Sequence, residues 1–517
     1  MSANSRLDKI CTEYFEEFLY RFPVKATKLG IHRYDYRLGS FSKKDFEGWA
    51  DFLKNTKNKV SALKVKKKRK LDYSLLARRI DNELNWVINE REYETNPLMY
   101  TSTIKDGLFY CAFGAYAPLN VRGRNFLDRL NEIETIRKES EENLQFADYL
   151  EKEVALQELR FLYKFIDEFS SYLTGKSDIE KKDDFRAARV NALEEINEML
   201  NFIEKLHIAQ NERRLSFIKK IKREYLEDYP LNEIQLDLQN RLTNLSKLIE
   251  NKAREIKISQ SSKETLKEIM NDKKMPTLEE ISVAFDNVKR AGENKFGRTN
   301  STIEFKLMMQ IKNRKFDSIK EIDSGIVIPL GPFDAHTTIP LMLATPISPY
   351  LLLLKIVSLG YPGKSYESEI KKQKSPIFRK FFENSVFNEG WKLYVKRMMK
   401  DNLKQIYGNK FELVFLYDQY ETLFKALIEN ELLNRRISVE EFKGIVEKDR
   451  IILDKEALLH DVITENGKSL KSVIGLDSIV SIKSMFANRK MREKEFHIKL
   501  LSHSSLPFKF IRQALKR

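Results

Sequence analysis

Six histidines are the residues of this sequence best suited to bind a metal ion or to transfer protons. They are His32, His207, His336, His460, His497 and His503. Two histidines bind one metal ion from a single helix face when they stand three or four residues apart. No two of the six have that spacing. A zinc site would therefore have to combine histidines that are distant in the sequence.

Other catalytic patterns are weak or absent. Ser358 and Ser365 lie near Lys364, as in a Ser-Lys dyad, but serines beside a lysine are too common to be specific. The phosphate loop G-x-x-x-x-G-K-[ST], the dinucleotide motif G-x-G-x-x-G and the nucleophile elbow G-x-S-x-G do not occur. The sequence therefore predicts no cofactor and no metal, and it favours no catalytic residue.

The cysteine content indicates a reducing compartment. Cys11 and Cys111 are too few for a disulfide scaffold or a cysteine metal site. The first residues lack the continuous apolar stretch of a signal peptide. We therefore expect a cytoplasmic location.

The elements that would position these residues are mainly helices. From Leu7 to Leu173, and again from Asp178 to Asn271, apolar residues recur every three or four positions. Pro97 and Pro118 mark turns or helix starts within the first stretch. Ser438 and Glu441 form a capping-box pattern at the start of a later helix. The composition, with 18 Gly and 13 Pro in 517 residues, also favours long helices.

One short segment differs in pattern. The β-branched run Ile326 to Ile328 is bounded by glycine and proline and predicts a strand. The least polar stretch, Ile339 to Tyr361, is interrupted by prolines and by Lys355. We therefore interpret it as buried core and not as a membrane span.

The chain is basic, with 92 Lys and Arg against 76 Asp and Glu, a net charge of +16. The densest basic run is Lys64 to Lys70. Such charge suits a nucleic acid, an anionic membrane surface or an acidic partner, but most basic runs are solvated surface. No helix-turn-helix, RNA-binding aromatic motif or zinc finger accompanies the run, so nucleic-acid binding is weakly supported.

Several short blocks occur together in a fixed order. Near the start are Phe22-Pro23, Ala26-Thr27, Leu29 to His32, Tyr34-Asp35 and Arg37-Leu38, followed by Asp72-Tyr73, Leu75-Leu76, Asn96-Pro97 and Arg124 to Leu130. Later come Gly331 to Asp334, Tyr361 to Gly363, Glu389 to Trp391, Leu393-Tyr394, Glu495 to His497, Leu500-Leu501 and Leu506-Pro507. In order and spacing this set resembles the family of bacterial and archaeal proteins that share domain of unknown function 885.

The resemblance implies a fold and a division of the chain. Members of that family are similar to helical zinc oligopeptidases of the neurolysin and angiotensin-converting-enzyme type. The resemblance thus implies a mainly α, two-lobed body around a deep cleft, with a small strand element. We expect one family-like unit over 1–517, made of an N-terminal helical part (1–175), a charged helical arm (176–300) and a former active-site part (301–517).

The family's metal motif is changed in this chain. Members carry H-E-x-x-P-G-H-H, which resembles two zinc ligands and a glutamate base, and the Glu of E-G-W resembles the third ligand. Aligned on Tyr361-Pro362-Gly363, Ser358 stands in the place of the first histidine, Leu359 in the place of the base, and Lys364 in the place of another ligand. Of these positions only Glu389 keeps the family residue, and one carboxylate cannot hold zinc against water.

Other positions of the family's cleft differ as well. The segment Gly475 to Ile482 lacks a tyrosine that resembles a transition-state stabiliser, and Leu433 stands where the family has a histidine. By resemblance, the remaining candidates for ligand contact are Tyr361, Trp391, Tyr394 and His497. For His497 a hydrogen-bonded structural role is the alternative, and for His32 we favour packing or helix capping.

The sequence thus predicts a pseudoenzyme relative of a zinc metallopeptidase family, retained for binding a peptide or a protein. An enzyme of different chemistry reusing the cleft, or a basic nucleic-acid- or ribosome-associated factor, remains an alternative. We further expect Lys364 to approach Glu389, because removal of zinc would leave that carboxylate without a cation.

Overall fold

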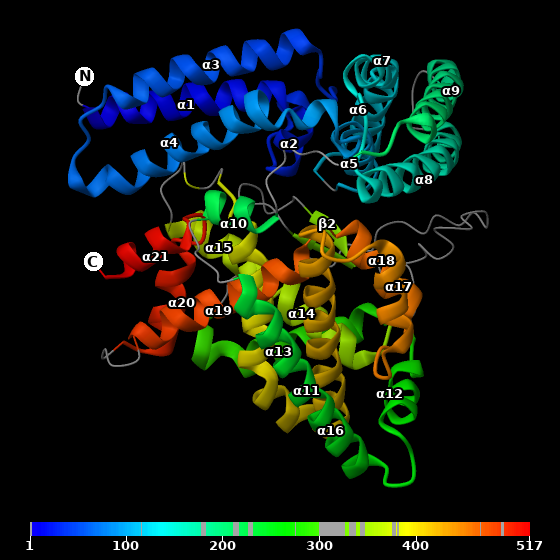
Figure 1. Cartoon of the computed structure of the whole chain (residues 1–517), viewed down its shortest axis with the longest axis vertical. Helices are drawn as coiled ribbons and strands as arrows, with labels where there is room; N and C mark the ends of the chain where they lie inside the picture. Colours follow the sequence, from blue (N-terminus) through cyan, green and yellow to red (C-terminus); the bar gives the residue numbers. More distant parts are fainter. Residues whose placement is uncertain are drawn as a thin grey trace. The chain divides into compact units, whose positions relative to one another are not determined.

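The computed structural model describes residues 3–114, 116–176, 182–209, 217–225, 231–274, 276–298, 326–329, 338–341, 347–374, 379, 382–465, 467–486 and 491–516. Within them the protein is mainly α-helical, as predicted (Figure 1). The chain divides into two compact units. Met1–Leu215 and Lys306–Ala344 form the first unit, and Ser216–Phe305 and Thr345–Arg517 form the second. Residues 176–300, expected as one charged arm, are divided between the two.

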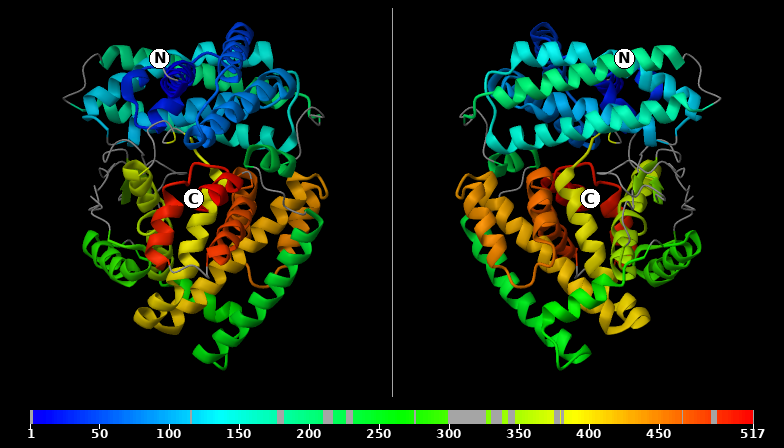
Figure 2. Two further views of the ribbon diagram at one scale, coloured as in Figure 1. Left: turned by 90° about the vertical axis from the view of Figure 1, so that its left-hand side faces the viewer. Right: turned by 90° about the vertical axis from the view of Figure 1, so that its right-hand side faces the viewer.

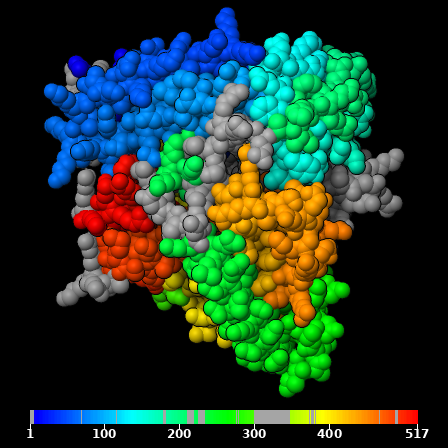
Figure 3. Space-filling view, viewed as in Figure 1, coloured from blue at the N-terminus to red at the C-terminus, as the bar shows by residue number. Residues whose placement is uncertain are grey.

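The first unit contains helices α1 to α9 and two short strands. The helices are α1 (Ala3–Arg21), α2 (Pro23–Lys28), α3 (Lys43–Ser61), α4 (Lys70–Asn85), α5 (Leu98–Phe113), α6 (Leu119–Asn131), α7 (Ile133–Asn143), α8 (Tyr149–Thr174) and α9 (Lys182–Lys205). Helices α1, α3 and α4 pack together, and their atoms form one continuous surface (Figure 3). Helices α8 and α9 lie side by side (Figure 2). Helices α5 and α6 begin directly after Pro97 and Pro118, which confirms those predicted helix starts.

The strands pair with each other. Strand β1 (Ile326–Pro329) runs antiparallel to β2 (Thr338–Leu341), with Ile326 opposite Leu341. Strand β1 covers the run predicted as a strand from the sequence. The block Gly331 to Asp334 and His336 lie outside the described residues.

A fully buried arginine explains the first family block. The Arg129 guanidinium, on α6, donates to the carbonyls of Arg37 and Gly107 and, at 2.8 Å, to the Thr27 hydroxyl. Thr27 in turn donates to the buried Asp35 carboxylate at 2.6 Å. An isolated buried charge is costly, so these contacts tie three distant chain segments together. The block therefore has a structural role in the first unit.

His32 belongs to the same polar network. Its Nδ1 lies 2.8 Å from the Asp35 carboxylate, and its ring stacks on Tyr116 at 4.2 Å between centroids. These contacts agree with the packing role favoured from the sequence.

The second unit contains the remaining helices. They are α10 (Phe217–Tyr225), α11 (Leu231–Ile256), α12 (Ser262–Asn271), α13 (Leu278–Phe296), α14 (Pro349–Leu359), α15 (Lys364–Lys374), α16 (Ser385–Leu433), α17 (Val439–Lys448), α18 (Lys455–Thr464), α19 (Lys468–Phe486), α20 (Glu493–Leu501) and α21 (Phe508–Leu515). The predicted capping box at Ser438 and Glu441 is present at the start of α17. In α14 the residues Leu352 to Leu354, Ile356 and Val357 are buried, as expected for a core segment.

Helix α16 reverses direction at Gly408. That residue has φ 75° and ψ −163°, a conformation that essentially only glycine adopts. Lys396 pairs with Asp418 at 2.7 Å although the two are 22 residues apart, a separation of about 33 Å along a straight helix. The element is therefore a helical hairpin. Its two limbs are also joined by Glu412, which pairs with Lys400 at 3.2 Å and with Lys404 at 2.7 Å.

Candidate functional site

The residues aligned with the family's first ligand and base lie at the end of α14. The Ser358 side chain is buried, and its hydroxyl donates to the Lys355 carbonyl at 3.2 Å. Leu359 ends the helix and is half-buried. A tight turn with a cis Tyr361-Pro362 bond leads to α15. A Cβ atom at Gly363 would lie 2.0 Å from the Ser358 carbonyl oxygen, so this turn requires glycine.

The start of α16 packs against that turn and against α19. The Trp391 indole donates to the Pro362 carbonyl at 3.0 Å. A Cβ on Gly390 would lie 2.4 Å from the Gly475 Cα, and a Cβ on Gly475 would lie 2.0 Å from the Val386 carbonyl oxygen. Two glycines thus allow the backbones of α16 and α19 to cross closely. The E-G-W and Tyr361 to Gly363 blocks therefore build one helix junction.

The expected pairing of Lys364 with Glu389 is wrong. Lys364 instead pairs with Glu367 on its own helix at 2.9 Å, and Glu389 pairs with Lys392 at 2.7 Å. In both pairs the residues stand three positions apart, where helix geometry brings side chains together without reorientation. Each charge thus found a closer partner on its own helix than across the junction.

Glu367 is the more deeply buried of the two carboxylates. Burial alone would raise its pKa, but the positive charges of Lys364 and Lys371 lower it below its usual range. The Ser504 hydroxyl also donates to this carboxylate. The sequence alone did not reveal Glu367 as the partner of Lys364.

The aromatic and histidine candidates form a buried cluster. Tyr361, Trp391, Tyr394 and His497 are each at most 2% exposed. His497 Nδ1 lies 2.8 Å from the Lys295 carbonyl, which can only accept, so Nδ1 carries the proton and Nε2 accepts from the Tyr394 hydroxyl at 2.8 Å. Burial lowers the pKa of His497 to about 4, so the ring is neutral.

The polar atoms of the other two candidates are also bonded inside the protein. The Tyr361 hydroxyl donates to the Gly297 carbonyl, and the Trp391 indole is bonded to Pro362 as described. All four side chains are therefore committed to packing in this structure.

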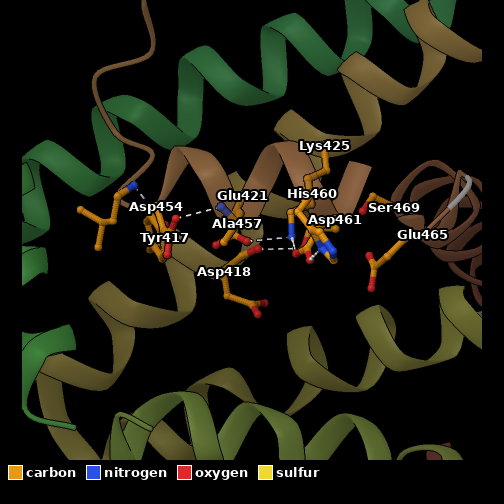
Figure 4. Close-up of polar contacts among 12 residues, drawn as sticks. Tyr417, Asp418, Glu421, Lys425, Asp454, Ala457, His460, Asp461, Glu465 and Ser469 are labelled. Atoms are coloured by element: carbon orange, nitrogen blue, oxygen red, sulfur yellow. Dashed lines mark hydrogen bonds and ion pairs between the residues drawn. The ribbon is translucent and has the colours of Figure 1, made fainter. Parts of the chain in front are cut away.

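A band of charged residues joins α16 to α18, and the sequence did not single it out. Lys425 pairs with Glu421 at 2.9 Å and with Asp461 (Figure 4). Tyr417 accepts a hydrogen bond from the Leu453 amide at 3.2 Å. In Figure 4 this band continues to Glu465 and Ser469, near the start of α19.

The start of α19 is held by a buried carboxyl group. Glu429 accepts from the Leu470 amide at 2.7 Å and from the Ser469 amide at 3.3 Å. Helix N-termini attract negative charge, yet burial raises the pKa of Glu429 to about 7. This carboxyl group is therefore partly protonated near neutral pH.

One lysine of this region differs from its neighbours. Lys364, Lys392, Lys396, Lys425 and Lys468 each have a carboxylate within 4.0 Å. Within the described part of the chain, Lys355 on α14 has none. Its side chain is exposed, and the partial loss of water around the ammonium, together with the charges of Lys396 and Lys468, lowers its pKa.

The described ranges contain neither a metal-ligand cluster nor a membrane-spanning helix. No three or more His, Cys, Asp or Glu side chains there converge as a metal ion would require. Nor is any described helix both long and apolar enough to cross a membrane. Cys11 and Cys111 are buried and not disulfide-bonded.

The fold and this region together define a mainly helical protein of two units with a charged, histidine-poor helix junction. The chain belongs to the family of bacterial proteins of unknown function designated DUF885, whose match spans residues 23–309. That match includes the first family block but ends before α14, α16 and α20. A search of curated proteins found no match.

Two solved structures share the fold over nearly the whole chain. One is a candidate lipoprotein of unknown function from Shewanella oneidensis, 14% identical, with a TM-score of 0.71, covering 99% of this chain and 100% of that one. The other is a candidate lipoprotein from Colwellia psychrerythraea, 11% identical, with a TM-score of 0.78, covering 100% of this chain and 99% of that one. At these identities the likeness concerns the fold alone.

Proposed function

We propose that this protein is a noncatalytic member of its family that binds peptides through the second unit. The carrying observation is that the positions aligned with the metal site hold Ser358, Leu359 and Lys364, of which Ser358 is hydrogen-bonded to its own helix and Lys364 is paired with Glu367. A serine bonded to its own helix, a leucine and a paired lysine supply neither a zinc ligand nor a proton acceptor. The remaining carboxylate, Glu389, is neutralised by Lys392.

The binding part of the proposal rests on the charges of this region. Lysines and carboxylates of α14, α16, α18 and α19 lie close together, and peptides carry both kinds of charge at their ends. Complementary charges give specificity and orientation to such a ligand. We also propose that the fold is related to that of the zinc oligopeptidases, with a cleft between two lobes.

Metal analysis and peptide assays test the proposal together. The purified protein, dialysed without chelator, should contain much less than one zinc per chain and should bind labelled tetrapeptides without cleaving them. About one zinc per chain, with cleavage that a chelator abolishes and that Glu389→Ala removes, would refute the noncatalytic reading. Absence of binding to any peptide of a mixed tetrapeptide library would refute the binding reading.

A second candidate function, nucleic-acid association, is favoured by the segment from the end of α3 to the first residue of α4. Lys64, Lys66, Lys67 and Lys70 are exposed there. Among the described residues none of them has a carboxylate within 4.0 Å, so all four charges are available to an anionic polymer. RNA that copurifies at low salt and dissociates steeply as salt rises would support this function over peptide binding.

The cellular location is also a proposal. Two buried, unlinked cysteines suit the reducing cytoplasm. The descriptions of the two structural neighbours as candidate lipoproteins favour the cell envelope instead. Cell fractionation followed by detection of the protein distinguishes the two locations.

A further inference from the structure

Tyrosines and arginines gather on the surface of the first unit, where α1 ends and the short 3-10 helix His32–Tyr34 follows α2. The members of this tyrosine-arginine cluster are Tyr20, Arg33, Tyr34, Tyr36 and Arg37. Tyr20 is 51% exposed and Tyr36 is 50% exposed. The half-buried Tyr34 ring meets the Tyr20 ring edge-on, with 6.1 Å between the centroids. Exposed rings that gather in one place, unlike single ones, mark an interaction surface.

Each arginine of the cluster lies over a tyrosine ring. The Arg37 guanidinium carbon is 4.7 Å from the centre of the Tyr20 ring, and that of Arg33 is 4.8 Å from the centre of the Tyr34 ring. Arg33 is also paired with Glu16. Within the described residues Arg37 has no carboxylate partner. Contact with a ring orients the Arg37 guanidinium and leaves its N–H groups able to bind an anion.

The composition of the cluster indicates the kind of partner. It offers three tyrosine rings but only one arginine without a carboxylate, so ring contact outweighs charge. An acidic peptide would need several unpaired cations and no exposed rings. A nucleic-acid strand has flat bases that stack on aromatic and guanidinium planes, joined by phosphates that pair with arginine. In a duplex the bases already stack on one another, so the cluster suits a single strand.

The basic segment that suits a nucleic acid contacts the same helix. Arg69 of that segment pairs with Asp8 on α1 at 2.5 Å. Tyr20 lies about 18 Å further along the axis of α1. A strand of a few nucleotides is long enough to contact both places. The exposed lysines would attract phosphates of any strand, and the tyrosines would add a preference for unpaired bases.

We infer that the tyrosine-arginine cluster binds single-stranded nucleic acid, with bases stacked on Tyr20 and Tyr36 and a phosphate paired with Arg37. This inference goes beyond peptide binding and rests on the second candidate function, nucleic-acid association. It adds to that function the form of the nucleic acid and the residues that select it. Because stacking and phosphate attraction come from different residues, substitutions can separate them.

The test uses a fluorescein-labelled oligouridine of about 12 nucleotides and a labelled RNA duplex of the same length. Fluorescence polarisation should show that the wild type binds the single strand at least about fivefold more tightly than the duplex. Tyr20→Leu and Tyr36→Leu should each weaken single-strand binding about tenfold and leave duplex binding unchanged. Tyr20→Phe keeps the ring and should bind as the wild type does. Arg37→Met should lower the salt dependence by about one charge.

The matched control is Tyr163→Leu. The Tyr163 ring is 45% exposed on α8, outside the cluster, so this variant should bind both nucleic acids as the wild type does. Circular dichroism checks that each variant is folded. Substitution at two separate tyrosines keeps the test decisive if one of the variants does not fold.

The outcomes separate this inference from the candidate function on which it rests. If both leucine variants bind the single strand as tightly as the wild type, or if the wild type does not prefer the single strand, the inference is overturned. Nucleic-acid association still stands in that case if binding is lost on changing Lys64, Lys66, Lys67 and Lys70 together to methionine. If neither nucleic acid binds, both ideas fall. If polyglutamate displaces the strand as well as unlabelled oligouridine does, the cluster takes acidic chains, which also overturns the inference.

Discussion

Replacing Gly475 with alanine should destabilise the second unit, although alanine is the better helix former. The new Cβ would lie 2.0 Å from the Val386 carbonyl oxygen and 2.8 Å from the Gly390 Cα. Ordinary contacts begin near 3.4 Å, so α16 and α19 would have to separate locally by about 1.4 Å. Both opposing atoms belong to the backbone and cannot move aside by rotating a side chain.

The expected size of the effect follows from two opposing contributions. Overpacking costs up to about 3 kcal/mol when side chains can adjust, and a backbone contact lies at the upper end of that range. The higher helix propensity of alanine stabilises the helix by about 1 kcal/mol and offsets part of this cost. The net loss of about 2 kcal/mol should lower the melting temperature by about 4–8 °C.

A matched substitution on another helix provides the control. Gly444 lies inside α17, and a Cβ there would meet nothing within 4 Å. Gly444→Ala should therefore stabilise the protein by about 0.5–1 kcal/mol and raise the melting temperature by about 2 °C. Thermal unfolding followed by circular dichroism measures both variants. If Gly475→Ala melts at or above the wild-type temperature, the close crossing of α16 and α19 is refuted.

Three further predictions concern buried polar groups. Glu429→Gln should leave stability unchanged at pH 4 and raise it by up to about 3 kcal/mol at pH 8, because the unfolded wild type loses the Glu429 proton near pH 4.5 whereas the folded protein, with a pKa of about 7, keeps it and becomes less stable as the pH rises between these values. Tyr394→Phe should cost about 1–3 kcal/mol, because it leaves Nε2 of the buried His497 without a donor, as urea unfolding would show. Lys364→Met should cost about 3 kcal/mol, because it leaves the buried Glu367 charge without its nearest cation, and its melting temperature should fall accordingly.

Each of these predictions has a control and an opposing result. If the stability of the wild type does not fall relative to that of Glu429→Gln between pH 4 and pH 8, the raised pKa is contradicted. Tyr36→Phe, at a ring that is 50% exposed, should change the free energy of unfolding by less than about 0.5 kcal/mol. If Tyr36→Phe lowers the free energy of unfolding as much as Tyr394→Phe, the hydrogen bond between Tyr394 and His497 does not account for the effect. Lys392→Met removes a more exposed pair and should cost about 1 kcal/mol, so an equal loss in both lysine variants would contradict the burial argument.

Patterns that act within a few residues predicted the fold well. Helix periodicity, the capping box at Ser438 and the helix starts after Pro97 and Pro118 all depend on local chemistry, and the structure contains them. The sequence analysis does not predict the reversal of α16 at Gly408, because an isolated glycine inside a helical pattern is compatible with a continuous helix.

The candidate site was harder to predict because it depends on contacts between distant segments. The alignment puts Lys364 at a lost ligand position, from which we expected it to pair with Glu389, but in the folded protein each residue has a partner on its own helix. In the sequence Gly475 is only the first residue of a segment that lacks the family's tyrosine. In the structure its missing side chain allows the backbone of α16 to approach closely. The absence of a partner for Lys355 is likewise a property of the assembled unit, and no spacing in the sequence records it.

The Arg129 network has a consequence for the order in which the first unit can fold during synthesis. Thr27 leaves the ribosome 102 residues before Arg129, and Arg37 leaves it 92 residues before. Until Arg129 emerges, Asp35 has no buried cation nearby, and enclosing its carboxylate would cost several kcal/mol. The segment from Thr27 to Arg37 is therefore expected to close only after α6 has been synthesised. A nascent chain stalled before α6 would expose this segment to proteases, whereas one stalled after it would be protected.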